Sequence, residues 1–235
     1  MIRAVLFDLD GTLVSSLSEL AKGVAMLSEE LGLPVPPESA VSDMIGGGVR
    51  VLVERLFSWW QEQGASAQTT VDVALCRLVD IWGSISGSLV TEIPGAFASV
   101  AGLRKVGFAV WLVTNKERAL TEAFLKERGI EQLFDGLVAA GDCPRLKPAP
   151  DMLLRAIEEA GVAANEAVMV GDSRNDALAA RAAGMRAMLV ESGYNEGVPL
   201  RDWARSEGFD EVFPTVKEVC EDLIAKRRSM AECGR

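Results

Sequence analysis

Short apolar runs alternate with amphipathic stretches along most of the chain, and this pattern predicts strands separated by helices. The apolar runs cover residues 2–7, 108–113, 136–139, 167–170, 187–190 and, more weakly, 211–213. They are almost continuously apolar, as strands are when both faces of a sheet are covered. The amphipathic stretches predict helices over residues 96–106, 117–129, 152–161, 175–184 and 216–228. Strand and helix in alternation predict an α/β fold: a doubly wound, Rossmann-like parallel sheet with helices on both faces.

One long segment after the first strand lacks strand patterns and predicts a small all-helical insertion. Ser16-Leu17-Ser18-Glu19 has the spacing of a capping box, which predicts a helix that runs to Gly32. A second helix is expected from near Gly48 and a third over residues 69–81. The predicted division of the chain is therefore an α/β core made of residues 1–15 and 89–235, and a helical cap made of residues 16–88.

The amino-acid composition excludes several classes of function for this chain. The 235 residues include 34 acidic and 24 basic side chains, for a net charge of −10, which argues against nucleic-acid binding. The chain has no histidine, so histidine-based acid–base catalysis and histidine metal sites are excluded. No apolar run reaches the roughly 18 residues of a membrane span. The four cysteines are scattered and no signal peptide precedes the first strand, so free thiols and a cytoplasmic location are expected.

Asp8-Leu9-Asp10-Gly11-Thr12 follows the first predicted strand directly. Side chains alternate along an extended segment, so Asp8 and Asp10 are expected to point the same way. Two carboxylates that close repel each other unless a counter-charge is present. Mg²⁺ is a suitable counter-charge because it prefers oxygen ligands.

Further polar groups follow other predicted strands. Thr114 and Asn115 follow residues 108–113, Lys147 lies in the loop after residues 136–139, and Asp172 and Asp176 follow residues 167–170. Ligands of open parallel sheets bind at the carboxyl ends of the strands, so these groups are expected to converge on one site. Each has a simpler alternative. Thr114–Glu117 and Ser173–Asp176 have capping-box spacing, and a lone lysine is usually solvated.

In this order, the motifs resemble those of the haloacid dehalogenase superfamily of phosphotransferases: D-x-D-G-T, then a threonine, then a lysine, then G-D-x-x-x-D. The resemblance implies that Asp8 is the nucleophile, which forms an aspartyl-phosphate, and that Asp10 is the general acid and base. It also implies Mg²⁺ bound by Asp8, Asp172 and the backbone carbonyl of Asp10. The remaining implied roles are phosphate binding by Thr114, Asn115 and Lys147, and support of the metal site by Thr12, Ser173 and Asp176.

Further stretches resemble the phosphoglycolate phosphatases within that superfamily. They are residues 45–48 with 52–55, residues 171–176 with 182–185, and Gly193-Tyr194-Asn195-Glu196-Gly197. The chain departs from that family at Cys143, where an acidic residue is common, and at Ala149, where histidine is common. The implied substrate is 2-phosphoglycolate, whose carboxylate needs a local cation, and Arg50 and Arg55 are the candidates in the cap.

Alternatives remain at this point. The chain could be a phosphatase for another small phosphosugar or phospho-acid, or a phosphosugar mutase, since the cap selects the substrate. A phospho-accepting receiver module shares the parallel sheet, Mg²⁺ and a phosphorylated aspartate, but not the insertion or the D-x-D-G-T motif. A small phosphomonoester is the expected partner, with no nucleic acid or membrane, and either a monomer or a homodimer is compatible with the sequence.

Overall fold

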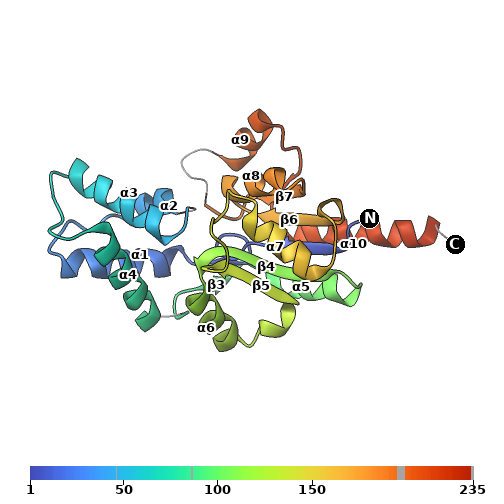
Figure 1. The fold of residues 1–235 in the computed structure, drawn as a ribbon, viewed down its shortest axis with the longest axis horizontal. Helices are drawn as coiled ribbons and strands as arrows, with labels where there is room; N and C mark the ends of the chain where they lie inside the picture. The colour runs from blue at the N-terminus through green and yellow to red at the C-terminus, as the bar shows by residue number, and fades with distance from the viewer. Residues whose placement is uncertain (46, 86, 195–198, 234–235) are drawn as a thin grey trace.

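The computed structural model describes residues 1–45, 47–85, 87–194 and 199–233, and its centre is a six-stranded sheet (Figure 1). The strand order is β5-β4-β1-β6-β7-β8, and every neighbouring pair is parallel. The strands are β1 (Ala4–Phe7), β4 (Ala109–Glu117), β5 (Gly136–Ala140), β6 (Ala167–Gly171), β7 (Arg186–Val190) and β8 (Val212–Phe213). The predicted doubly wound α/β fold is therefore confirmed.

Alternation along β1 explains why helices cover both faces of the sheet. Val5 and Phe7 belong to one apolar cluster, and Ala4 and Leu6 belong to another; all four side chains are fully buried. The first cluster is completed by α5 (Ala96–Lys105), α6 (Arg118–Arg128) and α10 (Val216–Cys233), and the second by α7 (Asp151–Ala160) and α8 (Arg174–Ala182). A strand buried on both sides must be apolar at successive positions, which is the pattern that the sequence carries.

The sheet reverses its winding direction beside β1. From β1 the chain builds β4 and β5 on one side, then crosses to build β6, β7 and β8 on the other. A reversal of this kind opens a crevice at the carboxyl ends of the central strands, where α/β proteins bind ligands. The crevice lies at the ends of β1, β4 and β6.

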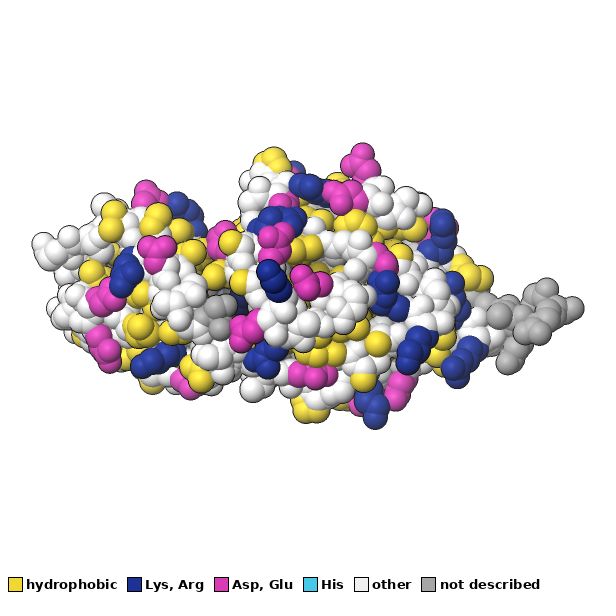
Figure 2. Space-filling view, turned by 90° about the horizontal axis from the view of Figure 1, so that it is seen from below, with side chains coloured by type: hydrophobic (Ala, Val, Ile, Leu, Met, Phe, Trp, Pro, Cys, Tyr) yellow, Lys and Arg dark blue, Asp and Glu magenta, His cyan; other side chains and the backbone are white. Residues whose placement is uncertain are grey.

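Four helices among the described residues form a lobe beside the carboxyl ends of the strands, at the left of Figure 1 and of Figure 2. They are α1 (Leu17–Glu30), α2 (Glu38–Met44), α3 (Val49–Glu62) and α4 (Val71–Ile85). They pack around their own apolar cluster, in which Leu27, Leu56, Trp60 and Leu78 are almost completely buried. Three helices were predicted here. The seven residues of α2 are too few for a helical period to be recognised.

A short antiparallel ribbon connects this lobe to the sheet. It pairs β2 (Val14–Ser15) with β3 (Thr91–Glu92), which are too short to leave a pattern in the sequence. The predicted capping box next to it was wrong: Ser16 precedes α1 but makes no capping hydrogen bond with its side chain. Glu19 instead accepts a 3.4 Å bond from the backbone N–H of Leu89, across the two connections. A tertiary contact has taken the place of the local one.

Other boundaries also differ from the prediction. Strand β4 continues to Glu117, so α6 begins at Arg118, and α10 continues to Cys233, beyond the predicted end at Arg228. One helix, α9 (Leu200–Glu207), and two short 3-10 turns, η1 (Glu131–Leu133) and η2 (Ala164–Glu166), were not predicted. Three of the four cysteines, Cys76, Cys143 and Cys220, are described as free thiols, as expected. Of the described helices, none has the length and apolarity that crossing a membrane requires.

Candidate active site

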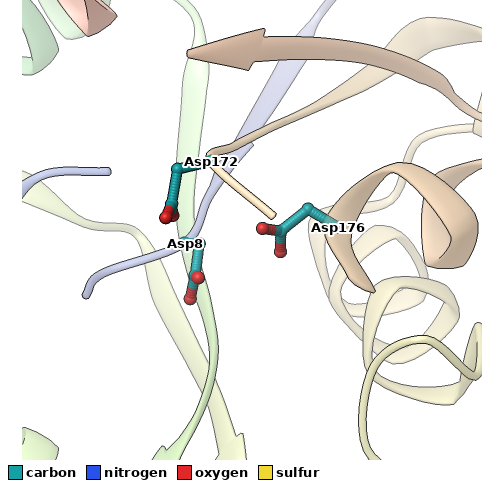
Figure 3. Close-up of side chains that lie close together, drawn as sticks. All are labelled: Asp8, Asp172 and Asp176. Atoms are coloured by element: carbon teal, nitrogen blue, oxygen red, sulfur yellow. The ribbon is translucent and has the colours of Figure 1, made fainter. Parts of the chain in front are cut away.

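Three carboxylates converge at the crevice from elements that are distant in sequence. Asp8 follows β1, Asp172 follows β6, and Asp176 lies in the first turn of α8. One oxygen of each lies within 4.8 Å of the others, and the side chains of Asp172 and Asp176 are turned toward Asp8 (Figure 3). Asp172 is 3% exposed and Asp176 is fully buried, so the three charges share a space that little water reaches.

Lys147 provides the positive charge of this cluster. Its Nζ lies 2.6 Å from Asp176 Oδ1 and 3.0 Å from Asp8 Oδ1, and it donates a 2.7 Å hydrogen bond to the carbonyl of Val113. Burial alone would lower the pKa of Lys147, but Asp176 and Asp8 outweigh that effect and the net shift is upward. With only 2% of its surface exposed, Lys147 is not a solvated surface lysine.

Asp172 is held by one hydroxyl and one backbone N–H, and two glycines lie against it. Thr12 Oγ1 donates to Asp172 Oδ1 at 2.8 Å, and the backbone N–H of Tyr194 donates to Oδ2 at 3.0 Å. A Cβ built on Gly11 or Gly193 would lie 2.2 Å or 1.9 Å from Asp172 Oδ2, which leaves no room for a side chain at either glycine. This enclosure fixes the direction of the carboxylate. Gly193 and Thr12 therefore both hold Asp172 in place; a supporting role at a metal site was predicted for Thr12, and no role was predicted for Gly193.

The electrostatics of the cluster match a site for a divalent cation. Burial raises the pKa of Asp8 to about 7, against the opposing effect of Lys147, and burial with the charge of Asp8 raises the pKa of Asp172 well above its usual range. Asp8 Oδ1 is buried and accepts no hydrogen bond, although Lys147 Nζ lies 3.0 Å away. An orphaned carboxylate oxygen among crowded anions is a ligand set that a hard cation would complete.

Asp176 caps α8, which was the simpler of its two predicted roles, and it also binds Lys147. The backbone N–H and the hydroxyl of Ser173 donate to Asp176 Oδ2 at 3.1 Å and 2.6 Å, and the N–H of Asp176 donates to Ser173 Oγ at 3.3 Å. This is a complete capping box at the start of α8. Because Oδ1 of the same carboxylate binds Lys147, the cap also positions that lysine.

The end of β4 contributes Thr114 and Asn115. Thr114 is 2% exposed and does not cap α6, because the chain stays extended to Glu117. The side-chain amide of Asn115 bonds both backbone groups of Lys147: it donates to the carbonyl at 2.9 Å and accepts from the N–H at 3.0 Å. Asn115 therefore holds the loop that carries Lys147, a role that its residue type alone did not indicate.

Asp10 lies apart from the three-carboxylate cluster and has its own lysine. Lys116 Nζ lies 3.2 Å and 3.3 Å from the two carboxylate oxygens of Asp10. No role was predicted for Lys116. The available signal was its place two residues after Thr114 on the strand that neighbours β1, which is close enough to reach the D-x-D segment.

A pocket opens above these groups, between the sheet and the helical lobe. Asp8, Asp10, Thr114, Asn115, Lys116, Lys147 and Asp172 form its floor, together with Ser173 and Tyr194. The opposite wall is apolar and includes Leu20, Ile45, Val49, Leu52 and Trp82. Tyr194 also connects the two sides, since its hydroxyl accepts a 2.8 Å hydrogen bond from the backbone N–H of Ser16.

Neither predicted cap arginine lines the pocket in the part of the chain that the structure describes. Arg50 is exposed and pairs with Asp72 at 2.6 Å. Arg55 donates to three backbone carbonyls, including those of Met44 and Ile45, each at 3.2 Å. Arg55 thereby holds the end of α2. Gly46, Asn195, Glu196 and Gly197, which contributed to the family resemblance, lie outside the described residues.

The site thus combines a doubly wound sheet, a cluster of aspartates and a buried lysine at the carboxyl edge of that sheet, and a helical lobe across the pocket. Comparison with known proteins gives the family. The chain belongs to the haloacid dehalogenase-like hydrolases, whose model matches residues 5–190.

Relatives with assigned names agree with this family. The chain is 34% identical over 225 residues to phosphoglycolate phosphatase 1 of Pseudomonas aeruginosa, covering 94% of this chain and 82% of that protein. It is 35% identical over 211 residues to phosphoglycolate phosphatase of Escherichia coli K12, covering 83% and 84% of the two chains. A crystal structure of a predicted phosphoglycolate phosphatase from Haemophilus somnus superposes with a TM-score of 0.87 at 27% identity, over 94% of this chain and 98% of that one. The protein is a phosphatase.

Proposed function

We propose that this phosphatase hydrolyses 2-phosphoglycolate to glycolate and phosphate through an aspartyl-phosphate on Asp8, with Mg²⁺ as its cofactor. The observation that supports the substrate most directly is the identity of 34–35% to phosphoglycolate phosphatases over most of both chains. The convergence of Asp8, Lys147 and Asp172 supports the mechanism. In this proposal residues 16–88 act as a cap on a core of residues 1–15 and 89–235, in a cytoplasmic enzyme.

In the first half of the reaction, a carboxylate oxygen of Asp8 attacks phosphorus and the bond to the leaving oxygen breaks. Asp10 gives its proton to that oxygen, so glycolate leaves with a neutral hydroxyl group. Lys147 spreads positive charge toward the phosphate oxygens and toward Asp8, which otherwise repels the phosphate dianion. Thr114 and the backbone that follows it hold the phosphate in place, while Asn115 keeps Lys147 in position.

In the second half, Asp10 takes a proton from water and the water oxygen attacks phosphorus. The bond between phosphorus and Asp8 breaks, which regenerates the carboxylate and releases phosphate. Mg²⁺, held by Asp8, Asp172 and the backbone carbonyl of Asp10, would supply the charge that offsets the crowded anions. Thr12, Ser173 and Asp176 would keep these ligands and Lys147 in fixed orientations.

The proposal is tested by phosphate release from a panel of small phosphomonoesters at equal concentration. We expect 2-phosphoglycolate to give the highest kcat/KM. A low rank for 2-phosphoglycolate, beside a clearly better phosphosugar, would contradict the substrate assignment. Trapping ³²P on wild-type protein but not on Asp8→Asn would test the covalent step separately.

The apolar wall of the pocket supports a second candidate. Leu20, Leu52 and Trp82 line the pocket together with the charged groups, and they offer apolar surface that a two-carbon acid has little apolar surface to match. A phosphatase for a larger phosphosugar or phospho-acid would use that wall to bury its leaving group. The same panel separates the two candidates, because a larger leaving group would then be preferred.

A further inference from the structure

Lys116 is the cation that stands beside the proposed general acid in the pocket. Its Nζ lies 3.2 Å and 3.3 Å from the carboxylate oxygens of Asp10, and its side chain is 13% exposed. We infer that Lys116 binds the carboxylate of the substrate and so determines the preference for 2-phosphoglycolate. This inference rests on the proposed function and adds to it the residue that recognises the leaving group.

The other lysine of the pocket, Lys147, already has partners for its ammonium group. Lys147 Nζ has three acceptors in reach, Val113 O, Asp176 Oδ1 and Asp8 Oδ1, at 2.7 Å, 2.6 Å and 3.0 Å. Val113 O and Asp176 Oδ1 each accept a hydrogen bond from this ammonium group, and its charge also pairs with Asp8, so Lys147 is engaged beside the proposed nucleophile. Lys147 is also positioned against the nucleophile, where it meets the phosphate and not the leaving group.

The two arginines predicted to bind the substrate, Arg50 and Arg55, both bind other groups of the protein. Arg50 pairs with Asp72 at the surface, and Arg55 donates to the carbonyls at the end of α2. Among the described residues that line the pocket, Lys116 and Lys147 are the cationic ones, while Asp8, Asp10, Glu19, Glu117 and Asp172 are acidic. A substrate with two or three negative charges would be repelled by these acidic side chains. We therefore expect one lysine to bind its phosphate and the other to bind its carboxylate.

Lys116 retains a proton for a ligand. Within the described residues, the hydrogen bonds of Lys116 Nζ go to the two oxygens of Asp10, with the long distances of 3.2 Å and 3.3 Å. An ammonium carries three donors, and charged pairs at their optimum are shorter, about 2.7–2.9 Å. A second carboxylate can therefore join Lys116 without the loss of a strong contact.

The covalent structure of 2-phosphoglycolate brings its carboxylate to this lysine. The carboxylate carbon is two bonds from the leaving oxygen, so its own oxygens lie about 3 Å from that oxygen. Asp10, when it protonates the leaving oxygen, sits about 2.7 Å from it. A cation that contacts both oxygens of Asp10 is then within reach of the substrate carboxylate. The same arrangement gives no advantage to a phosphomonoester with an uncharged leaving group.

The test compares Lys116→Met with wild type on two substrates of similar size, 2-phosphoglycolate and 2-hydroxyethyl phosphate. Loss of one charge-assisted hydrogen bond is expected to lower kcat/KM for 2-phosphoglycolate about 10- to 100-fold more than for 2-hydroxyethyl phosphate. Glycolate should inhibit the wild type competitively and Lys116→Met at least about tenfold less well. Arg50→Met is the matched control, since it removes a cation outside the pocket, and it should leave the ratio of the two substrates unchanged.

An equal loss on both substrates would overturn the inference, because Lys116 would then serve Asp10 alone. A wild type that hydrolyses 2-phosphoglycolate poorly would instead contradict the proposed function, and this result is seen before any variant is made. Lys116→Gln, measured with the same substrates and glycolate, gives a second reading if Lys116→Met fails to fold, as judged by its unfolding midpoint.

Discussion

The two walls of the pocket are built on opposite principles. On the sheet side, polar groups are fixed by partners: Asp172 by Thr12 and Tyr194, and Lys147 by Asn115 and Asp176. On the side of the helical lobe, apolar side chains such as those of α3 and α4 face the pocket from a separate hydrophobic cluster. Contacts of the second kind depend on shape and are non-directional.

In the proposed function, this difference separates the residues that act on the phosphoryl group from those that contact the leaving group. Phosphoryl transfer depends on accurately positioned charge, and the proposed catalytic residues lie at the carboxyl edge of the sheet in a network of hydrogen bonds. The leaving group meets a wall that can change shape or composition without a change in that network. Tyr194 lies where the two walls meet, and the predictions below test how far the separation holds.

Replacing the proposed nucleophile, Asp8, should give the largest effect. Asp8→Asn keeps the size of the side chain but removes its nucleophilic charge, so kcat is expected to fall by at least about three orders of magnitude. Phosphate release by protein purified free of wild type measures it, with circular dichroism as the control for folding. Retention of a tenth of the rate would contradict covalent catalysis by Asp8.

Removal of the metal should have an effect of nearly the same size. Asp8, Asp172 and Asp176 bring together negative charge that a divalent cation would offset. Excess chelator is expected to abolish turnover, and Mg²⁺ to restore it. Ca²⁺ should inhibit, because it takes more oxygen ligands at longer distances and can occupy Asp8. Full activity in chelator would show that Lys147 alone supplies enough charge.

Filling the space beside Asp172 should weaken the sheet-side wall without touching the reacting groups. A Cβ on Gly193 would lie 1.9 Å from Asp172 Oδ2, so Gly193→Ala must displace that carboxylate. We expect metal affinity to fall about 10- to 100-fold, as for other changes behind a metal ligand. Gly83→Ala is the matched control, since nothing lies within 4 Å of its Cβ position. Isothermal titration with Mg²⁺ measures both, and equal affinities would show that the enclosure has room to relax.

The metal-free protein should become less stable as the pH rises from about 4 to about 7. The pKa of Asp8 is 3.8 in an ordinary environment and about 7 here, so in this interval the folded state holds a proton that the unfolded state has released. The free energy of unfolding therefore falls with increasing pH, by about 4 kcal/mol at most. Asp8→Asn should flatten this slope. Urea unfolding in chelator across the interval measures it, and an identical slope in the variant would assign it to other groups.

The smallest effect is expected for a change at Tyr194, which connects the two walls of the pocket. Tyr194→Phe removes the hydroxyl that accepts from the backbone N–H of Ser16 at 2.8 Å, but keeps the backbone bond to Asp172. A loss of about 1 kcal/mol in unfolding free energy is expected, with Mg²⁺ affinity unchanged. A large loss of metal affinity would show that the connection to α1 holds Asp172 as well.

Local patterns of apolar and polar residues were enough to predict most of the fold. The continuous apolar runs identified all six strands of the parallel sheet, because strands covered on both faces must be apolar throughout. They also placed Asp8, Thr114 and Asp172 directly after predicted strands and Lys147 in the loop after another, so that parallel topology brings all four to one edge of the sheet. Elements of two to seven residues, such as β2, β3 and α2, were not predicted because the periodicity of apolar residues can be recognised only in longer segments.

Contacts across the fold decided the rest. The sequence determined which residue types stand at the carboxyl edge of the sheet, since strand length and turn residues are local properties. Only the tertiary structure decided that Ser16 binds Tyr194 rather than capping α1, that Asn115 holds Lys147, and that Lys116 meets Asp10. The members of each pair are between 32 and 178 residues apart, and a single sequence carries no local signal for a hydrogen bond of that range.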